Sequence, residues 1–168
     1  MLAKTQISVE EYLALVFPDR PEPDYVHGEV VEHGLPDVLH SAILARLGIV
    51  FGPLTRAGSL LLSRVRVQIE PDLFRVMDFA VYRGMPRGRY GTTPPFVAVE
   101  IVSPDDLYTN LILRLEDYRR WGVPNVWLVD PFLRRLYEYT DAGLLQHPSL
   151  TLPGFDFAIS AAELFRDL

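Results

Sequence analysis

The chain has 168 residues, of which 49% are hydrophobic, and it contains no cysteine. This length can bury a core without disulfides, so a single domain over residues 1–168 is expected, and thiolate metal sites and cysteine nucleophiles are excluded. The net charge of −6 argues at first against a polyanionic partner. However, residues 1–40 hold eight acidic and two basic side chains, whereas residues 41–168 hold fourteen of each, so the excess lies in the first quarter.

No apolar run approaches the roughly 18 residues of a membrane span. The first six residues, Met-Leu-Ala-Lys-Thr-Gln, lack the apolar core of a signal peptide. We therefore expect a cytoplasmic protein with no membrane partner.

The first half of the chain predicts alternating helices and strands. Ser8 and Glu11 have the spacing of a capping box, so a short helix should run to about Val16. A strand is predicted over 25–31, followed by a helix over 39–51.

A strand is also predicted from Leu60 to Ile69, because Val65 and Val67 alternate with arginines at 64 and 66. Such alternation is typical of a strand with one solvent-exposed face. The arginines are therefore expected on the outside of the sheet.

Two further strands each carry one acid in an otherwise apolar run. Asp78 lies within residues 74–81, and Glu100 lies within residues 95–102. An unpaired carboxylate is costly to bury, so each acid needs a cation, a hydrogen-bond network or a shifted pKa. Two carboxylates on neighbouring strands predict a site for a divalent metal.

The segment after Glu100 predicts a helix from about Ser103 to Trp121. Ser103 is expected as the N-cap, with Asp105 and Asp106 as acids of the first turn rather than metal ligands. Helical spacing places Arg114 on the apolar stripe, facing inward, and Asp117 on the helix surface. A buried arginine near two acids is either their structural counter-ion or a catalytic cation that holds a phosphate, and the sequence leaves both open.

The last third predicts strands over 126–129 and 136–139, with Asp130 in the turn between them. Ser160 and Glu163 have the capping-box spacing of a short terminal helix. Together the elements predict an α/β fold with a central mixed β-sheet flanked by helices.

Five segments, taken in order, resemble the "putative restriction endonuclease" family of the PD-(D/E)XK nuclease superfamily. They are Asp-Tyr-Val-His-Gly-Glu at 24–29, Val-Met-Asp-Phe-Ala-Val at 76–81, Phe-Val-Ala-Val-Glu-Ile-Val-Ser-Pro-Asp-Asp at 96–106, Arg-Leu-Glu-Asp-Tyr at 114–118 and Val-Trp-Leu-Val-Asp-Pro at 126–131. The resemblance implies a restriction-endonuclease-like core. It also implies Mg²⁺ (or Mn²⁺) bound by Asp78, Glu100 and the backbone carbonyl of Ile101.

One position departs from the family pattern. The superfamily motif has a lysine two residues after the glutamate, where this chain has Val102. The resemblance implies that in this family the lysine has moved to the following helix, where Arg114 occupies the matching position. Arginine keeps the charge and can clamp a phosphate, but with a pKa above about 12 it is a poor general base. Asp78, Glu100 and Arg114 are the expected catalytic residues.

Several other residues are weaker candidates for contact with substrate. Glu29 and His40 match family positions, although an exposed strand glutamate and a structural helix-end histidine are the alternatives. His27 replaces the aspartate that is usual in the family. The loop that follows residue 82 contains Arg83, Arg87 and Arg89, which either contact phosphate or are simply solvated.

Two function classes follow from these residues. The first is a metal-dependent endonuclease that acts on DNA, and the second is a catalytically degenerate nuclease fold that binds nucleic acid or a protein. A third reading, in which Asp78 and Glu100 are the acid and base of a glycosidase, is disfavoured by the inward Arg114 and by the family resemblance. A homodimer is expected, because the edge strands and the segment 132–137 offer surface for pairing.

Overall fold

The computed structural model describes residues 6–168. Residues 1–5, on which part of the signal-peptide expectation rests, lie outside this range. The first half of the described chain forms these elements in order: α1 (Val9–Ala14), β1 (Asp24–Val26), β2 (Glu29–Val31), α2 (Val38–Phe51), the 3-10 helix η1 (Gly52–Ala57), β3 (Leu60–Glu70) and β4 (Leu73–Tyr82). The second half forms β5 (Val97–Ile101), α3 (Tyr108–Trp121), β6 (Asn125–Asp130), β7 (Arg135–Thr140), β8 (Gly143–His147), β9 (Ser149–Thr151), β10 (Ala158–Ser160) and α4 (Ala161–Leu164).

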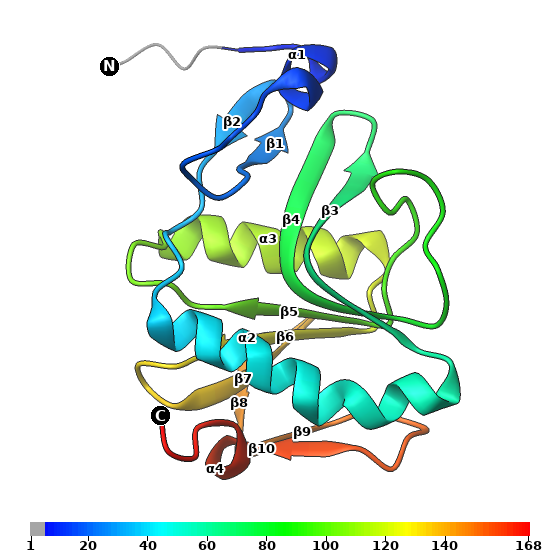
Figure 1. Ribbon diagram of the computed structural model, residues 1–168, viewed down its shortest axis with the longest axis vertical. Helices are drawn as coiled ribbons and strands as arrows, with labels where there is room; N and C mark the ends of the chain where they lie inside the picture. The colour runs from blue at the N-terminus through cyan, green and yellow to red at the C-terminus, as the bar shows by residue number, and fades with distance from the viewer. Residues whose placement is uncertain (1–5) are drawn as a thin grey trace.

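The main sheet has the strand order β2-β1-β4-β5-β6-β7-β8, and β3 also pairs with β4 (Figure 1). Its pairs are antiparallel except for β5 and β6, which run parallel and are joined through α3. A second, two-stranded sheet is formed by β9 and β10. The predicted central mixed sheet is therefore confirmed.

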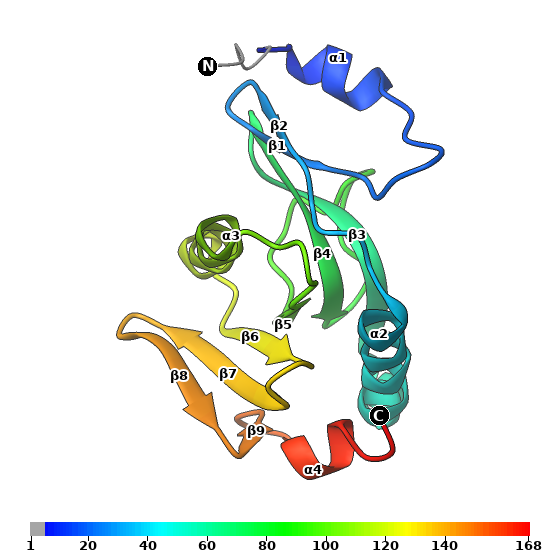
Figure 2. The ribbon, with the colours of Figure 1, turned by 90° about the vertical axis from the view of Figure 1, so that its left-hand side faces the viewer.

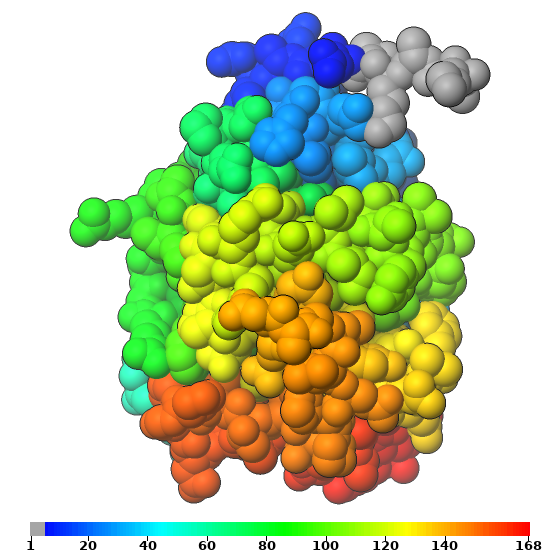
Figure 3. Space-filling model, turned by 180° about the vertical axis from the view of Figure 1, so that it is seen from behind, coloured from blue at the N-terminus to red at the C-terminus, as the bar shows by residue number. Residues whose placement is uncertain are grey.

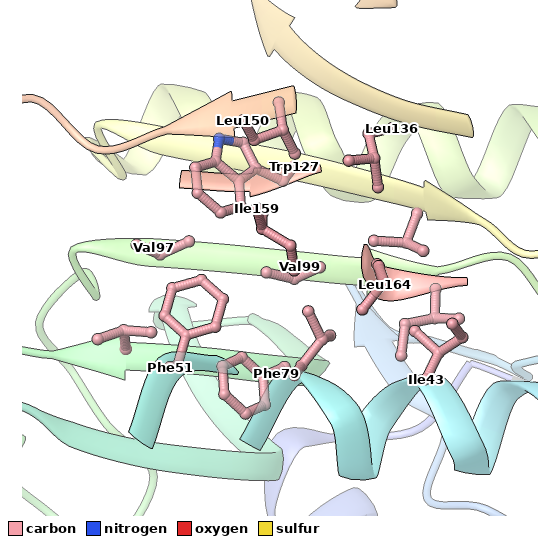
Figure 4. Packing of buried hydrophobic residues seen from close by; sticks show 14 of the residues in the cluster. Ile43, Phe51, Phe79, Val97, Val99, Trp127, Leu136, Leu150, Ile159 and Leu164 are labelled. Atoms are coloured by element: carbon pink, nitrogen blue, oxygen red, sulfur yellow. The ribbon is translucent and has the colours of Figure 1, made fainter. Parts of the chain in front are cut away.

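The two long helices cover opposite faces of the sheet (Figure 2). On one face, α2 contributes Ile43 and Phe51 to a cluster with Phe79, Val99 and Trp127 (Figure 4). On the other face, α3 packs in a cluster that includes the small side chains of Ala80 and Ala98 on the central strands β4 and β5. Seen from behind, α3 and the β7–β8 hairpin form much of the surface (Figure 3).

Both predicted capping boxes are present. The Ser8 hydroxyl accepts the backbone N–H of Glu11 at 3.1 Å, and the Glu11 carboxylate accepts the N–H of Ser8 at 2.7 Å. The same reciprocal pair joins Ser160 to Glu163 at the start of α4.

The strand predicted over 25–31 was wrong, because this segment is a β-hairpin. His27 and Gly28, at φ 48° and 95°, turn the chain between β1 and β2. Two consecutive left-handed residues suit the tight turn of a hairpin, whose twist matches that of its strands.

The predicted start of the helix at residue 103 was also wrong, because α3 begins at Tyr108. Residues 103–106 instead form a turn, in which the N–H of Asp106 donates to the carbonyl of Ser103 at 3.1 Å. Sequence reasoning also missed η1, β8, β9 and β10.

The stretch Val38–Ala57 is long and apolar enough to cross a membrane, judged by length and composition alone. This differs from the sequence expectation that no segment approaches a membrane span. Within this fold its side chains His40, Ile43, Leu47 and Phe51 are buried.

Candidate metal centre

Asp78 on β4 and Glu100 on β5 face each other across adjacent strands. Phe79 pairs with Val99 in the antiparallel ladder, so continuing the register by one residue sets Asp78 across from Glu100. Both side chains are buried, with 3% and 0% of the residue surface exposed. The structure thus brings together the two acids that the sequence singled out.

The Asp78 carboxylate has three polar partners. Its Oδ2 accepts the backbone N–H of Ile101 at 3.0 Å and lies 3.3 Å from Nε2 of His40. Its Oδ1 accepts a hydrogen bond from Arg64 on β3 at 2.9 Å. Burial acts to raise the pKa of Asp78, but His40, the Ile101 N–H and the charge of Arg114 together hold it below its usual value.

Glu100 is less completely satisfied. Its Oε1 accepts a hydrogen bond from the Tyr118 hydroxyl at 2.8 Å, whereas its buried Oε2 has no hydrogen-bond partner among the described residues. Arg114 places NH1 3.4 Å from this atom, close enough for an ion pair. Burial raises the pKa of Glu100 to about 7; the charge of Arg114 opposes this rise, and that of Asp78 adds to it.

Arg114 projects from α3 into the same centre, as its helical spacing predicts, and its side chain is only 5% exposed. Its guanidinium contacts Nδ1 of His33 and lies 3.4 Å from Oδ1 of Asp106 as well as from Glu100. Burial acts to lower the pKa of Arg114, but the surrounding acids, Glu100 first, raise it above its usual value. The guanidinium therefore stays charged and is held on several sides.

A second buried ionic cluster lies behind Arg114. His33 lies with Nε2 2.7 Å from Asp24, and Arg75 joins Asp24 to Asp117 through contacts of 2.9 and 2.5 Å. Burial acts to raise the pKa of Asp24, but the His33 charge and hydrogen bond, with the charges of Arg75 and Arg114, hold it well below its usual value. Charged groups from β1, β4 and α3 are thus linked in one network.

The turn after β5 adds an acid to this network. Asp106 accepts the N–H groups of Ser103 at 2.8 Å and Gly34 at 3.3 Å, besides facing Arg114. A Cβ on Gly34 would lie 2.9 Å from Cβ of Ser103, so only glycine fits where the linker between β2 and α2 passes this turn. The prediction that Asp106 is a first-turn helix acid was therefore wrong.

A pocket of about 350 Å³ opens beside Arg114. Its lining includes four acids, Asp24, Glu32, Asp105 and Asp106, together with His33. The first turns of α2 and α3 lie on this same side of the molecule, on either side of the end of β5 (Figure 2).

The oxygen atoms of the Asp78 and Glu100 carboxylates suit a hard divalent cation. Mg²⁺ and Mn²⁺ prefer oxygen ligands, and here two carboxylates from adjacent strands converge next to the Ile101 peptide group. The buried Oε2 of Glu100, which lacks a hydrogen-bond donor among residues 6–168, offers one ligand atom without the loss of an existing hydrogen bond. The carboxylate oxygens of Asp78 and Glu100 are therefore suitable ligands for such a cation. A cation bound at Oδ1 of Asp78 would replace the hydrogen bond from Arg64.

Residues 9–162 match a protein family named Uma2 and described as "Putative restriction endonuclease". The chain belongs to the Uma2 family. This confirms the resemblance found in the sequence, since the matched range contains all five motif segments.

The fold is similar to that of the crystal structure of "a putative nuclease belonging to DUF820" from Anabaena variabilis ATCC 29413. The two chains share 23% sequence identity with a TM-score of 0.80, over 95% of this chain and 97% of that chain. At this identity the likeness shows the fold alone, and it supports the restriction-endonuclease-like core. No curated protein matches this chain.

Not all of the sequence-predicted residues meet at this Uma2 centre. His40 does, from the first turn of α2, where the Asp37 side chain accepts its backbone N–H at 2.7 Å. Glu29 lies at the turn end of the β1–β2 hairpin, paired with Val26 in the ladder, whereas Asp24 at the other end contacts the charged network.

The structure does not bring Arg83, Arg87 and Arg89 to the carboxylates. Their loop leaves the end of β4 and returns to the start of β5, at the opposite end of the sheet from the first turns of α2 and α3 (Figure 1). The guanidinium of Arg83 stacks over Phe96 with its carbon 4.1 Å from the ring centroid. A phosphate contact by this loop would therefore lie away from Asp78.

Another possible metal-binding group lies on the surface. His27, Glu70 and Asp72 place one ligand atom each within 4.8 Å of one another, and all three are exposed. His27 Nδ1 lies 3.0 Å from Asp72. Any metal titration of this Uma2 chain must separate this group from the buried pair.

Sequence reasoning missed several ion pairs, of which only that of Arg66 lies outside the charged network. Arg64 and Arg66 were expected on an exposed face, yet Arg64 pairs with Asp78 and Arg66 with Glu22 at 3.0 Å. Asp117 was expected on the helix surface and is buried against Arg75. The signal that could have found it was Arg75 itself, a charge in the same apolar strand as Asp78.

Proposed function

We propose that this chain is a metal-dependent endonuclease that hydrolyses DNA phosphodiester bonds. The observation that carries the proposal is the buried pair of carboxylates, Asp78 and Glu100, on adjacent strands. The description of the Uma2 family as an endonuclease supports DNA as the substrate.

Asp78, Glu100 and the carbonyl of Ile101 would hold Mg²⁺ or Mn²⁺. When bound, such a cation lowers the pKa of a coordinated water and stabilises negative charge on the reacting phosphate. Within the chain, the Ile101 N–H and the Tyr118 hydroxyl orient the two carboxylates, each by a hydrogen bond. Partners of this kind fix ligand geometry and tune affinity.

Arg114 supplies positive charge to the centre and cannot readily accept a proton, because its pKa is raised. It stands where the family pattern expects a lysine. Its contacts with His33, Asp106 and Glu100 keep the guanidinium in one position. Arg114 is therefore proposed to balance the carboxylates rather than to act as the base.

A second candidate function is a nuclease fold that binds nucleic acid or a protein without turnover. The observation that favours it is the same buried Arg114, which provides charge but no general base. The two candidates differ in whether DNA is cut in the presence of metal.

The test combines metal titration with cleavage. Calorimetry with Mn²⁺ should show binding that Asp78→Asn and Glu100→Gln each weaken strongly. Cleavage of supercoiled, linear duplex and single-stranded DNA in Mg²⁺ or Mn²⁺ should disappear in both variants. Metal binding without cleavage of any of these forms would favour the second candidate.

Asp72→Asn is the matched control, since it removes one carboxylate from the exposed His27, Glu70 and Asp72 group. This variant should keep the Mn²⁺ affinity and the cleavage rate of the wild type. If Asp72→Asn abolishes Mn²⁺ binding and Asp78→Asn does not, the buried site is refuted.

A further inference from the structure

Arg64 has an unusual backbone for a strand residue. Its φ is 51°, in the left-handed region that a non-glycine residue rarely adopts. The β3–β4 ladder pairs Ser63 with Phe79 and Val65 with Met77, which leaves Arg64 across from Asp78 at an interruption of the ladder. Such strained residues persist where the surrounding structure demands them, often at functional sites.

The two arginines of the centre differ in freedom. The Arg114 side chain is 5% exposed and contacts His33, Asp106 and Glu100. The Arg64 side chain is 28% exposed, and within residues 6–168 its one ion-pair partner is Asp78, at 2.9 Å from NH1. Arg64 can therefore leave its partner and remain solvated, whereas Arg114 cannot move without breaking several contacts.

The groove beside β3, the strand that carries Arg64, has fewer acids in its lining than the pocket beside Arg114. The pocket beside Arg114 has four acids in its lining. By contrast, a groove of about 450 Å³ between α2 and β3 has no acid among its described lining residues. These are Ser41, Gly48 and Ser63 with the apolar Leu44, Ala45, Leu61, Leu62 and Phe79. Ser63 and Ser41 directly adjoin Arg64 and His40 in the chain.

We propose that Arg64 is a catalytic residue that changes partner: it neutralises Asp78 in the absence of metal and binds a substrate phosphate once a divalent cation occupies Asp78. The proposal rests on the proposed nuclease function. It assigns the phosphate contact to Arg64, leaving Arg114 as the buried counter-ion. A guanidinium suits this role because it binds phosphate oxygens through two parallel N–H groups.

The first experiment measures metal affinity. Arg64→Gln removes the cation that competes for Asp78, so calorimetry should show Mn²⁺ binding roughly tenfold tighter than in the wild type. Arg66→Gln is the matched control, because it removes the same charge from the same strand but from a pair with Glu22. It should leave Mn²⁺ affinity unchanged. Arg64→Lys should lie closer to the wild type than Arg64→Gln.

The second experiment measures DNA affinity with Ca²⁺, another cation that takes oxygen ligands, using a short fluorescein-labelled oligonucleotide as duplex and as single strand. With Ca²⁺, Arg64→Gln should weaken binding roughly tenfold and lower the slope of log affinity against log salt by about one, the value for one lost phosphate contact. Without metal the same substitution should have little effect, because Asp78 then neutralises Arg64.

Melting curves are the check that each variant folds, and Mn²⁺ should restore any stability that Arg64→Gln loses. A purely structural Arg64 predicts lower stability but an unchanged salt slope with Ca²⁺, and that result overturns the proposal. So does an unchanged Mn²⁺ affinity in a folded Arg64→Gln variant. If the wild type binds no Mn²⁺, the nuclease function itself fails, and this inference fails with it. If Asp78→Asn and Glu100→Gln lose Mn²⁺ binding and cleavage while Arg64→Gln keeps the Mn²⁺ affinity and salt slope of the wild type, the function stands and only the role of Arg64 is wrong.

Discussion

Tyr118 donates a hydrogen bond of 2.8 Å to Oε1 of Glu100 from the helix that follows the glutamate's own strand. One strand–helix unit, β5 and α3, thus supplies both a proposed metal ligand and the group that orients it. The Glu100 carboxylate is thus oriented by a residue close to it in the sequence, although the centre as a whole is assembled from distant segments.

Tyr118→Phe should weaken Mn²⁺ binding by roughly 10- to 100-fold, the usual effect of losing a group that orients a metal ligand. Without the hydroxyl, Oε1 loses its donor and the pKa of Glu100 rises further, since this hydrogen bond lowers it. Calorimetry at constant pH measures the change. Tyr108→Phe, at the exposed start of the same helix, is the control, and equal affinities in the two variants would contradict the orienting role.

Arg114→Ala should destabilise the metal-free protein by about 3–5 kcal/mol, because it leaves the buried Glu100 and the partly buried Asp106 without their shared cation. Denaturant unfolding measures the loss. Arg119→Ala removes an exposed ion pair with Asp141 and should cost less than about 1 kcal/mol.

The Arg114 comparison decides between the two roles that the sequence left open. A loss as small as that of Arg119→Ala, together with loss of DNA cleavage, would instead make Arg114 a catalytic cation. Arg114→Lys is a companion test, because a lysine whose pKa is lowered near a metal can act as a general base.

Stability of the metal-free protein should fall as pH rises from about 4.5 to about 7. The pKa of Glu100 is raised to about 7 in the folded state, so over this range the folded protein binds more protons than the unfolded chain. Glu100→Gln should flatten this part of the profile. Denaturant unfolding at a series of pH values measures it, and a slope retained in the variant would show that another group is responsible.

Asp24 should produce the opposite trend in acid. Its folded pKa lies well below the ordinary 3.8, so the stability it contributes is present above that pH and is lost as pH falls further. Asp24→Asn should therefore be less stable at neutral pH and lose less stability on acidification. An unchanged acid profile would refute the depressed pKa.

The chain is expected to form a homodimer, partly through the turn between β6 and β7. Phe132 and Leu133 are 49% and 57% exposed there, although Asp130 orders the turn by accepting two backbone N–H groups at 2.9 Å. Light scattering at micromolar concentration should give a dimer mass that Leu133→Glu reduces to that of a monomer. A monomeric wild type removes this prediction.

Local patterns in the sequence were enough to predict several elements and the two acids of the centre. Apolar runs located β4, β5 and β6, capping boxes located α1 and α4, and the acids inside two strands located the centre. The helical spacing of Leu111, Arg114 and Leu115 predicted an inward arginine, and the structure buries all three side chains.

The remaining members of the centre depend on tertiary contacts that periodicity does not encode. The alternation of residues 64–69 predicts that Arg64 is exposed. Its side chain instead reaches Asp78, at the interruption of the β3–β4 ladder. His33 follows the β1–β2 hairpin, in a segment with no regular pattern, and contacts Arg114 from far away in the chain. The helical spacing of Asp117 predicts an exposed position on α3, but its side chain is paired with Arg75 on β4. Each was missed because its partner lies on a different element, which local spacing cannot reveal.

The link between Asp24, His33 and Arg114 determines the smallest fragment that can keep the centre intact. The first quarter of the chain carries the whole acidic excess, and before α2 it forms only the short helix α1 and two short strands, so it resembles a dispensable extension. Yet a fragment beginning at α2 would bury Arg75 and Arg114 with Asp24 missing. Trimming from the N-terminal side should therefore remove solubility and function together once the cut passes Asp24, even though Asp78 and Glu100 are untouched.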